Sequence, residues 1–211
     1  YIIGKSYFWK YEFYVEKGVF IPRRDTECLV ELSIRYLKAR SSPFIVDVGV
    51  GSGCILLSIL RDVTSARGVG IDISKTAIKV FLVNRKKLLL EDRATAILGD
   101  AFSSVRRAPL FDAVISNPPY VRSGEIDKLQ EEIVYFEPRE ALDGGEDGLQ
   151  FIRMLIREAY VRLKEGGFLA MEIGYDQSKA VKFLMERVGY KRIEIHKDLS
   201  GIERVVVGWK L

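Results

Sequence analysis

FIVDVGVGSGCILLSILRDV, residues 44–63, is the stretch of sequence that decides the fold. Its apolar start predicts a buried strand over 44–50, and CILLSILRDV (54–63) predicts a helix. Between them, Gly49, Gly51 and Gly53 occupy every second position, which allows a tight turn and a close approach of a ligand to the backbone. The spacing is G-x-G-x-G rather than the dinucleotide-binding G-x-G-x-x-G, and a purely structural tight turn remains the alternative interpretation.

The alternation of strand and helix continues outward from this stretch. Apolar segments predict six further strands, at 68–73, 94–100, 111–117, 168–174, 191–197 and 203–211. Helical spacing predicts further helices at 25–40, 75–90, 148–167 and 177–190. The first has Asp25 or Thr26 as its N-cap, and glycines end the one at 148–167. This order predicts an α/β fold with a mostly parallel, seven-stranded sheet covered by helices on both faces.

The segment ahead of this pattern has a different composition. Residues 6–22 are aromatic and β-branched, and Lys17-Gly18 is a turn signal, so we expect a β-hairpin there. We therefore divide the chain into a hairpin and linker, residues 1–24, and a main domain, residues 25–211.

Composition limits the kinds of partner and site. The 211 residues carry a net charge of +4, which permits a nucleic-acid partner without requiring one. No apolar run is long enough to span a membrane, so we expect no membrane partner. Two cysteines and one histidine are too few for a thiolate or histidine metal site, and we expect no metal.

The ends of the next two predicted strands carry acidic residues. Ligands of such sheets bind at the carboxyl ends of the strands, where Asp72 can accept hydrogen bonds from ribose hydroxyls. An N-cap for the helix near Ser74 is the alternative role of Asp72. The following strand ends at Asp100-Ala101, where a carboxylate can accept from an adenine amino group. With the glycine turn, these residues predict a nucleoside-type cofactor without phosphates, and S-adenosylmethionine fits.

The strand at 111–117 runs directly into Asn117-Pro118-Pro119-Tyr120. Two prolines supply no N–H and hold the backbone extended, so they make a stiff frame. The Asn117 side-chain oxygen and the Pro118 carbonyl can accept both N–H groups of a planar nitrogen, while Tyr120 packs over it. We therefore predict Asn117, Pro118 and Tyr120 as catalytic residues, against the alternative of a simple strand-ending turn.

Several motifs resemble those of a known enzyme family. DVGVGSG (47–53), GIDIS (70–74), LGDAF (98–102) and ISNPPYV (115–121) resemble S-adenosylmethionine-dependent methyltransferases that act on amino and amide nitrogens. Four longer segments look like the release-factor glutamine methyltransferases, the HemK/PrmC family: GVFIPRRDTECLVE (18–31), FEPREALDGGEDGLQFIRMLI (136–156), GGFLAMEIGYDQ (166–177) and DLSGIERVVVGW (198–209). The resemblance covers essentially the whole chain.

The resemblance implies a Rossmann-like class I methyltransferase that is cytoplasmic and releases S-adenosylhomocysteine. Such enzymes methylate the side-chain nitrogen of the glutamine in the Gly-Gly-Gln loop of class 1 peptide-chain release factors, so the expected partner is a release factor. The family's cofactor residues carry over onto Gly49, Val50, Gly51, Ser52, Gly53, Asp72, Asp100, Ala101 and Asn117, with Phe20 and Arg23 at the border of the pocket. Its substrate clamp carries over onto Asn117, Pro118, Pro119 and Tyr120. Hairpin packing is an equally good account of Phe20.

The sequence also departs from the family's pattern. Arg24 stands where the family usually has a second proline, and Ala101 stands where some relatives have a bulky aromatic. The small helical domain that the family carries ahead of the hairpin is not among these 211 residues, which begin at Tyr1; we expect a further segment upstream.

Two further classes of function stay open. The same clamp suits a ribosomal-protein glutamine or the N6 nitrogen of adenine in DNA or RNA, although no basic-aromatic tract of the kind that base flipping requires is present. A non-catalytic cofactor-binding scaffold is the more remote alternative, since it would not need the clamp.

Overall fold

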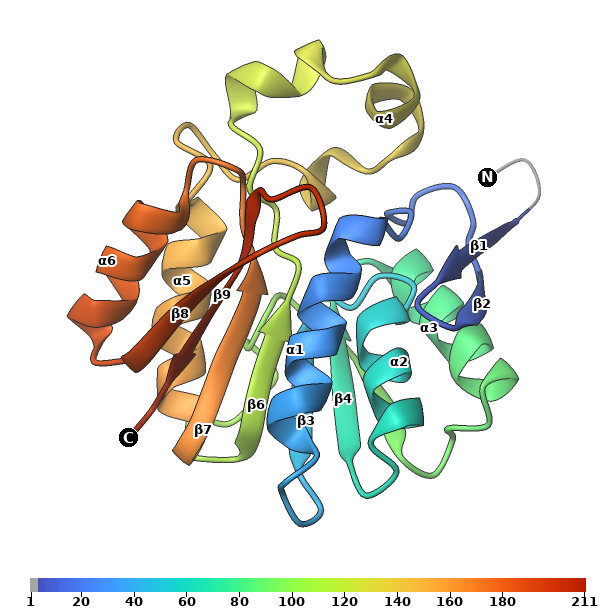
Figure 1. The fold of residues 1–211 in the computed structure, drawn as a ribbon. Coiled ribbons are helices and arrows are strands. Elements are labelled where there is room, and N and C mark those ends of the chain that lie inside the picture. Colours follow the sequence, from blue (N-terminus) through green and yellow to red (C-terminus); the bar gives the residue numbers. More distant parts are fainter. Residues whose placement is uncertain (1–3) are drawn as a thin grey trace.

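The structure, a computed structural model that describes residues 4–211, is built on one seven-stranded sheet (Figure 1). The strand order is β5-β4-β3-β6-β7-β9-β8, in which β9 pairs antiparallel with both β7 and β8 and every other pair is parallel. The strands are β3 (Phe44–Val48), β4 (Arg67–Asp72), β5 (Ala94–Leu98), β6 (Phe111–Ser116), β7 (Leu163–Glu172), β8 (Lys191–Lys197) and β9 (Glu203–Trp209). The α/β prediction with a mostly parallel sheet is confirmed.

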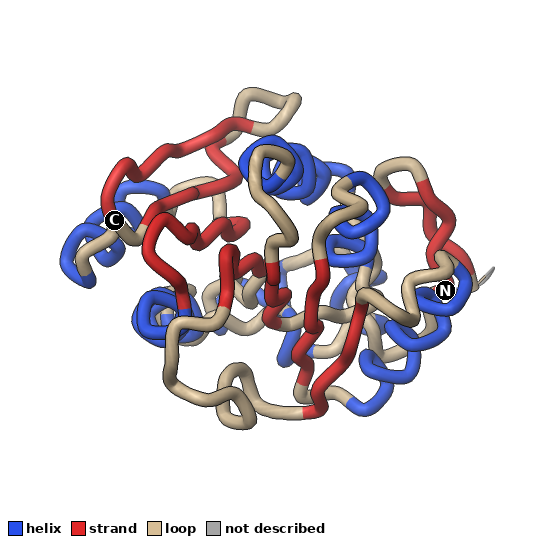
Figure 2. Tube along the Cα trace, turned by 90° about the horizontal axis from the view of Figure 1, so that it is seen from below, coloured by secondary structure: helices blue, strands red, loops and turns tan. Residues whose placement is uncertain are grey.

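Helices cover both faces of this sheet (Figure 2). They are α1 (Glu27–Leu37), α2 (Cys54–Asp62), α3 (Lys75–Lys87), α5 (Gln150–Arg162) and α6 (Ser178–Val188), whereas α4 (Glu131–Phe136) lies above the strand ends (Figure 1). Successive strand residues point to opposite faces, so Ile45 belongs to the core cluster that contains residues of α1 and α2, whereas Val46 belongs to the cluster that contains residues of α5 and α6. No helix within residues 4–211 is long and apolar enough to cross a bilayer.

The predicted hairpin is present, but its turn was predicted at the wrong place. β1 (Lys5–Phe8) pairs with β2 (Tyr11–Tyr14) across Trp9 and Lys10, whereas Lys17 and Gly18 form a separate turn after β2. Phe8 and Phe13 are fully buried in the same core as α1 and α2, so packing rather than the glycine sets the register of the hairpin. The division at residue 24 stays a prediction, and residues 1–3 lie outside the described part.

Two predicted helices differ in their ends. The helix predicted over 148–167 stops at Arg162, because Leu163 already pairs with Phe111 in the sheet. Buried Arg162 donates hydrogen bonds to the Phe102 and Val105 carbonyls, which holds the chain at this change of direction. The helix predicted over 25–40 spans Glu27–Leu37, preceded by the 3₁₀ turn η1 (Arg24–Thr26), and Thr26 caps it without a side-chain hydrogen bond.

A segment that the sequence analysis left unassigned lies above the strand ends. It contains the 3₁₀ turn η2 (Ser123–Lys128), α4 and a second short turn, η3 (Arg139–Ala141). We call residues 123–141 the cap (top of Figure 1). The residues just before and just after the cap lie side by side. The amide of Val121 donates to the Leu142 carbonyl, and the amide of Gly144 donates to the Val121 carbonyl.

The strand order reverses between β3 and β6. β4 lies on one side of β3 and β7 on the other side of β6, so the chain leaves these two central strands in opposite directions. Such a reversal opens a crevice at the carboxyl ends of the strands, which is where open α/β sheets bind ligands.

Candidate active site

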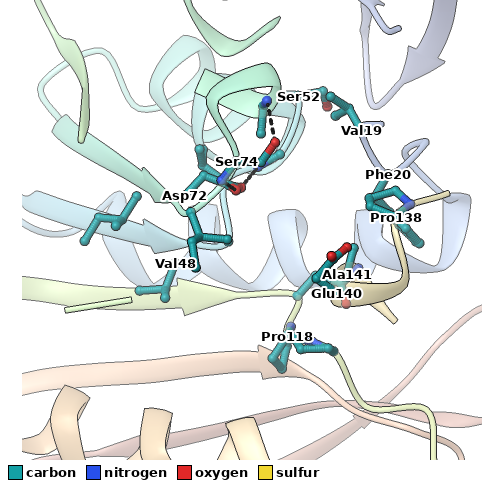
Figure 3. Close-up of a pocket in the computed structure, with 18 of the residues that line it drawn as sticks. Val19, Phe20, Val48, Ser52, Asp72, Ser74, Pro118, Pro138, Glu140 and Ala141 are labelled. Atoms are coloured by element: carbon teal, nitrogen blue, oxygen red, sulfur yellow. Dashed lines mark hydrogen bonds between the residues drawn. The ribbon is translucent and has the colours of Figure 1, made fainter. Parts of the chain in front are cut away.

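A cavity of about 620 Å³ lies at these strand ends, under the cap. Its volume falls within the ~300–1,000 Å³ that small-molecule sites occupy. Twelve of the predicted site residues line it: Phe20, Gly49, Val50, Gly51, Ser52, Asp72, Asp100, Ala101, Asn117, Pro118, Pro119 and Tyr120. Figure 3 shows Asp72 and Ser74 across the cavity from Phe20, Pro138 and Glu140. Gly53 and Arg23 are not among the lining residues.

The three glycines of the turn after β3 have two different roles. Gly49 and Gly51 have φ of 76° and 53°, and a Cβ on either would meet nothing within 4 Å, so their Cα atoms leave the cavity side open. A Cβ on Gly53 would lie 2.6 Å from the Phe81 ring, so this glycine allows α2 to pack against α3. The structural alternative, a tight turn, therefore accounts for glycine at all three positions, since each has a left-handed φ, and the open space beside Gly49 and Gly51 also suits the approach of a ligand.

Asp72 joins the end of β4 to the glycine turn. One carboxylate oxygen accepts from the Gly51 amide at 2.9 Å, and the other accepts from the Ser74 amide at 2.9 Å. The N-cap of α3 is Ser74, whose hydroxyl oxygen accepts from the Ala77 amide, so the alternative role of Asp72 as the cap is wrong. Burial raises the pKa of Asp72, and the backbone hydrogen bonds oppose that rise. Each oxygen keeps a lone pair that can accept from a ligand hydroxyl.

Asp47, in the middle of β3, is an acidic residue to which the sequence analysis gave no role. Its side chain is fully buried, and neither carboxylate oxygen has a hydrogen-bond partner of normal geometry. Burial raises the pKa of Asp47 well above its ordinary value, opposed only in part by the Leu56 backbone amide. The signal was available in the sequence, because a carboxylate inside an apolar strand is expensive to bury.

Asp100 and Ala101 follow β5 at the open side of the cavity. The Asp100 side chain is exposed, and Ala101 takes a left-handed φ of 43°. Phe102 does not replace the aromatic that some relatives have at position 101. Its ring is buried under the Arg162 guanidinium, at 4.6 Å, and does not line the cavity.

The Asn117–Tyr120 loop is held by buried polar groups beneath it. Asn117 Nδ2 donates to Thr26 Oγ1 at 3.3 Å, and the Tyr120 hydroxyl donates to Glu172 Oε1 at 3.0 Å. Burial beside the Glu172 carboxylate raises the pKa of Tyr120, so its hydroxyl stays protonated at neutral pH. Neither Thr26 nor Glu172 was predicted as a site residue, although both lie within motifs that carry the family resemblance.

Residues that follow the cap in the chain contact the backbone of the same loop. Gln177 Nε2 donates to the Tyr120 carbonyl at 3.0 Å and to the Gly148 carbonyl at 3.1 Å. A Cβ on Gly148 would lie 2.5 Å from the Tyr120 carbonyl oxygen, and one on Gly144 would lie 2.8 Å from the Tyr120 Cα. The cluster of glycines in LDGGEDG (142–148) therefore allows close packing behind Tyr120.

Arg23 acts from outside the cavity. Its guanidinium lies 5.1 Å from the centre of the Phe20 ring and forms a 2.5 Å ion pair with Glu137 of the cap. Burial raises the pKa of Glu137, and Arg23 opposes that rise. Phe20 lies beyond the hairpin and lines the cavity, while Arg23 ties the segment that carries Phe20 to the cap.

Comparison with known proteins identifies the family. The family model "Methyltransferase small domain" matches residues 10–146. A release factor glutamine methyltransferase from Clostridium acetobutylicum is 43% identical over 208 residues, which are 98% of this chain and 73% of that protein.

Two solved structures show the same fold. A protein-(glutamine-N5) methyltransferase (release factor-specific) from Alicyclobacillus acidocaldarius is 30% identical, with a TM-score of 0.55 over 89% of this chain and 93% of its own. A 16S rRNA methyltransferase from T. Thermophilus, solved in complex with AdoMet and guanosine, is 18% identical, with a TM-score of 0.70 over 98% of this chain and 50% of its own. The identity and coverage of the curated relative, with the motifs gathered around one cavity, place this chain in the release factor glutamine methyltransferase family.

Proposed function

We propose that this chain transfers a methyl group from S-adenosylmethionine to the side-chain amide nitrogen of the glutamine in the Gly-Gly-Gln loop of a class 1 peptide-chain release factor, in the cytoplasm. One observation carries the proposal: the Asn117–Tyr120 loop at the end of β6 shares a cavity with the glycine turn at the end of β3. A methyl donor and a planar nitrogen can therefore meet at the switch point of the sheet. The curated relatives are release factor glutamine methyltransferases, which supports this choice of substrate.

The residues present fit S-adenosylmethionine. The Cα atoms of Gly49 and Gly51 leave the backbone open to an amino-acid tail, and the Asp72 carboxylate has lone pairs for ribose hydroxyls. Asp100 and Ala101 lie where an adenine ring would bind, at the end of the next strand. When bound, the cofactor supplies a methyl group on a sulfonium, and its sulfur keeps the bonding electron pair on transfer.

The substrate nitrogen is held by the clamp. An amide nitrogen is a poor nucleophile because its lone pair is conjugated with the carbonyl. Asn117 Oδ1 and the Pro118 carbonyl accept its two N–H groups and direct the nitrogen toward the methyl carbon. Pro118 and Pro119 keep these acceptors stiff, and Tyr120 covers the amide plane and excludes water. Positioning of this kind accounts for effective molarities of about 10⁵ M or more.

No strong base is required. The nitrogen becomes acidic only once it carries the new methyl group, and its proton then passes to water. Cys54 lines the cavity, but burial raises its pKa to about 12, so it stays a neutral thiol. The chain's one histidine, His196, lies in β8, away from the cavity lining.

The test is transfer of a labelled methyl group to a purified class 1 release factor, with a Gly-Gly-Ala variant of the factor as the control. Label that depends on the glutamine supports the proposal. Label on a ribosomal protein or on an adenine-containing oligonucleotide instead would show that the substrate is wrong and that the methyl transfer to nitrogen is right. Cofactor binding without transfer to any of these substrates would favour the scaffold alternative.

A further inference from the structure

A buried carboxylate lies beneath the clamp and touches it through two hydroxyls. Glu172, the last residue of β7, is 2% exposed. Its Oε2 accepts from the Thr26 hydroxyl at 2.6 Å, and its Oε1 accepts from the Tyr120 hydroxyl at 3.0 Å. Nothing in the transfer mechanism described above uses Glu172, so the purpose of this buried acid is unexplained.

Counting protons shows what the carboxylate does. Burial raises the pKa of Glu172, but both of its oxygens act as acceptors in the structure, from the Thr26 and Tyr120 hydroxyls, which oppose that rise. A carboxylate oxygen that accepts takes the one proton that a threonine hydroxyl has to give. Since Thr26 gives its proton to Glu172, the Thr26 oxygen has only lone pairs left for Asn117. An asparagine side chain carries a donor NH₂ and an acceptor oxygen, and only the NH₂ can bond to a lone pair. The 3.3 Å contact between Asn117 Nδ2 and Thr26 Oγ1 agrees with this count.

We propose that Glu172 and Thr26 are positioning residues that fix the orientation of the Asn117 side-chain amide. Because Glu172 takes the Thr26 proton, the Asn117 NH₂ is drawn to Thr26 and Oδ1 is left for the cavity, where the clamp needs an acceptor. The inference deepens the proposed function and rests on it for the role of Oδ1. A reversed amide would present N–H to the N–H groups of the substrate and repel them.

The orientation can be observed without any enzyme assay. The chain contains only two asparagines, Asn84 and Asn117, so ¹⁵N-asparagine labelling gives two side-chain NH₂ signals. The Asn84 NH₂ donates to the Tyr14 and Ser52 carbonyls, away from Thr26, and serves as an internal reference. In Thr26→Val, which removes the hydroxyl and keeps the shape, we expect the Asn117 signal to move while the Asn84 signal stays. Thr26→Ser should restore the Asn117 signal.

The kinetic arm uses the same variants with a release factor as substrate. We expect Thr26→Val to lower kcat about tenfold or more, since small misplacements of a reacting group reduce rates by up to about 10². Thr26→Ser should return kcat to within a few fold. Ser33→Ala is the matched control, because Ser33 carries a buried hydroxyl in α1, the helix that Thr26 caps, and this hydroxyl donates to the Leu29 carbonyl and does not line the cavity. It should leave kcat unchanged.

Glu172→Gln gives a second, independent test if Thr26→Val fails to fold. A carboxamide can donate to Thr26, which then has its own proton free for Asn117 Oδ1. Both amide orientations become accessible, and we expect two or averaged Asn117 signals. An Asn117 signal whose position is unchanged in both Thr26→Val and Glu172→Gln would overturn the inference. Equal kcat values for Thr26→Val and Thr26→Ser would overturn it as well. Failure of the wild-type chain to methylate a release factor would instead count against the proposed function, since the Asn117 signal is measured without any methyl transfer.

Discussion

The Asp72 carboxylate accepts a hydrogen bond from the backbone amide of Gly51 at 2.9 Å, and this contact joins the ends of two neighbouring strands. β3 supplies the glycine turn and β4 supplies the acid, so the sheet register determines how the two halves of the cavity wall meet. The glycine turn is thereby held in shape before a ligand arrives, which lowers the entropy lost on binding.

Asp72→Ala should weaken S-adenosylmethionine binding, because it removes the acceptors for the ribose and loosens the turn at Gly51. We expect a loss of about 1.5–3 kcal/mol, the usual range for a lost hydrogen bond to a charged group. Titration calorimetry measures this directly. Asp92→Ala, at an exposed position outside the cavity lining, is the control. Equal affinities for wild type and Asp72→Ala would refute the ribose assignment.

Asn117→Ala should strongly reduce transfer while the fold survives. The side chain makes one hydrogen bond to Thr26 at 3.3 Å, so its removal alters few structural contacts but takes away an acceptor for the substrate. We expect transfer to fall by about 10²–10³, as when one catalytic hydrogen-bonding group is removed. Transfer is measured with labelled cofactor and folding by the melting temperature. A near-normal rate would rule out the clamp.

Asn84→Ala provides the contrast for that experiment. Asn84 Oδ1 accepts from the Tyr14 amide, and its NH₂ donates to the Tyr14 and Ser52 carbonyls, which ties the hairpin to the glycine turn. We expect a loss of stability of about 1–3 kcal/mol from the buried groups left unpaired. The two variants would then differ in their effects, because Asn117→Ala lowers the transfer rate and Asn84→Ala lowers the stability.

Much of the fold could be predicted from local patterns. The strand predicted at 191–197 has the bounds of β8, because apolar and polar residues alternate with a clear period of two. The strand-end residues Asp72 and Asn117 line one cavity, as expected for a sheet whose ligands bind at the carboxyl ends of its parallel strands.

The parts that were missed depend on contacts distant in sequence. Thr26 and Glu172 are 146 residues apart, and no local pattern pairs them. The cap has only a six-residue helix and two short 3₁₀ turns, too short to show a helical period. The turn of the hairpin was misplaced because Lys17-Gly18 gives a stronger local signal than Trp9 and Lys10, which form it.

Asp47→Asn should stabilise the protein, and the gain should depend on pH. A raised pKa in the folded state means that the fold binds the proton more tightly than the unfolded chain does, so stability falls as pH rises above the ordinary value of 3.8. The asparagine variant lacks this loss. The difference in unfolding free energy should be small near pH 4 and reach about 1–3 kcal/mol at neutral pH, the usual range for a poorly compensated buried polar group. Denaturant melts across pH measure it, and a pH-independent difference would contradict the assignment.

Gly148→Ala and Gly166→Ala form a matched pair that separates backbone strain from displacement of the clamp. Their φ angles are 74° and 73°, so backbone strain alone should cost both alanine variants a similar stability of about 1 kcal/mol. A Cβ on Gly166 meets nothing within 4 Å, whereas one on Gly148 would lie 2.5 Å from the Tyr120 carbonyl oxygen. We therefore expect a lower melting temperature for Gly148→Ala than for Gly166→Ala, and a transfer rate reduced about tenfold or more only in Gly148→Ala, because Tyr120 must shift. Equal transfer rates in the two variants would show that the clamp tolerates movement of its backbone.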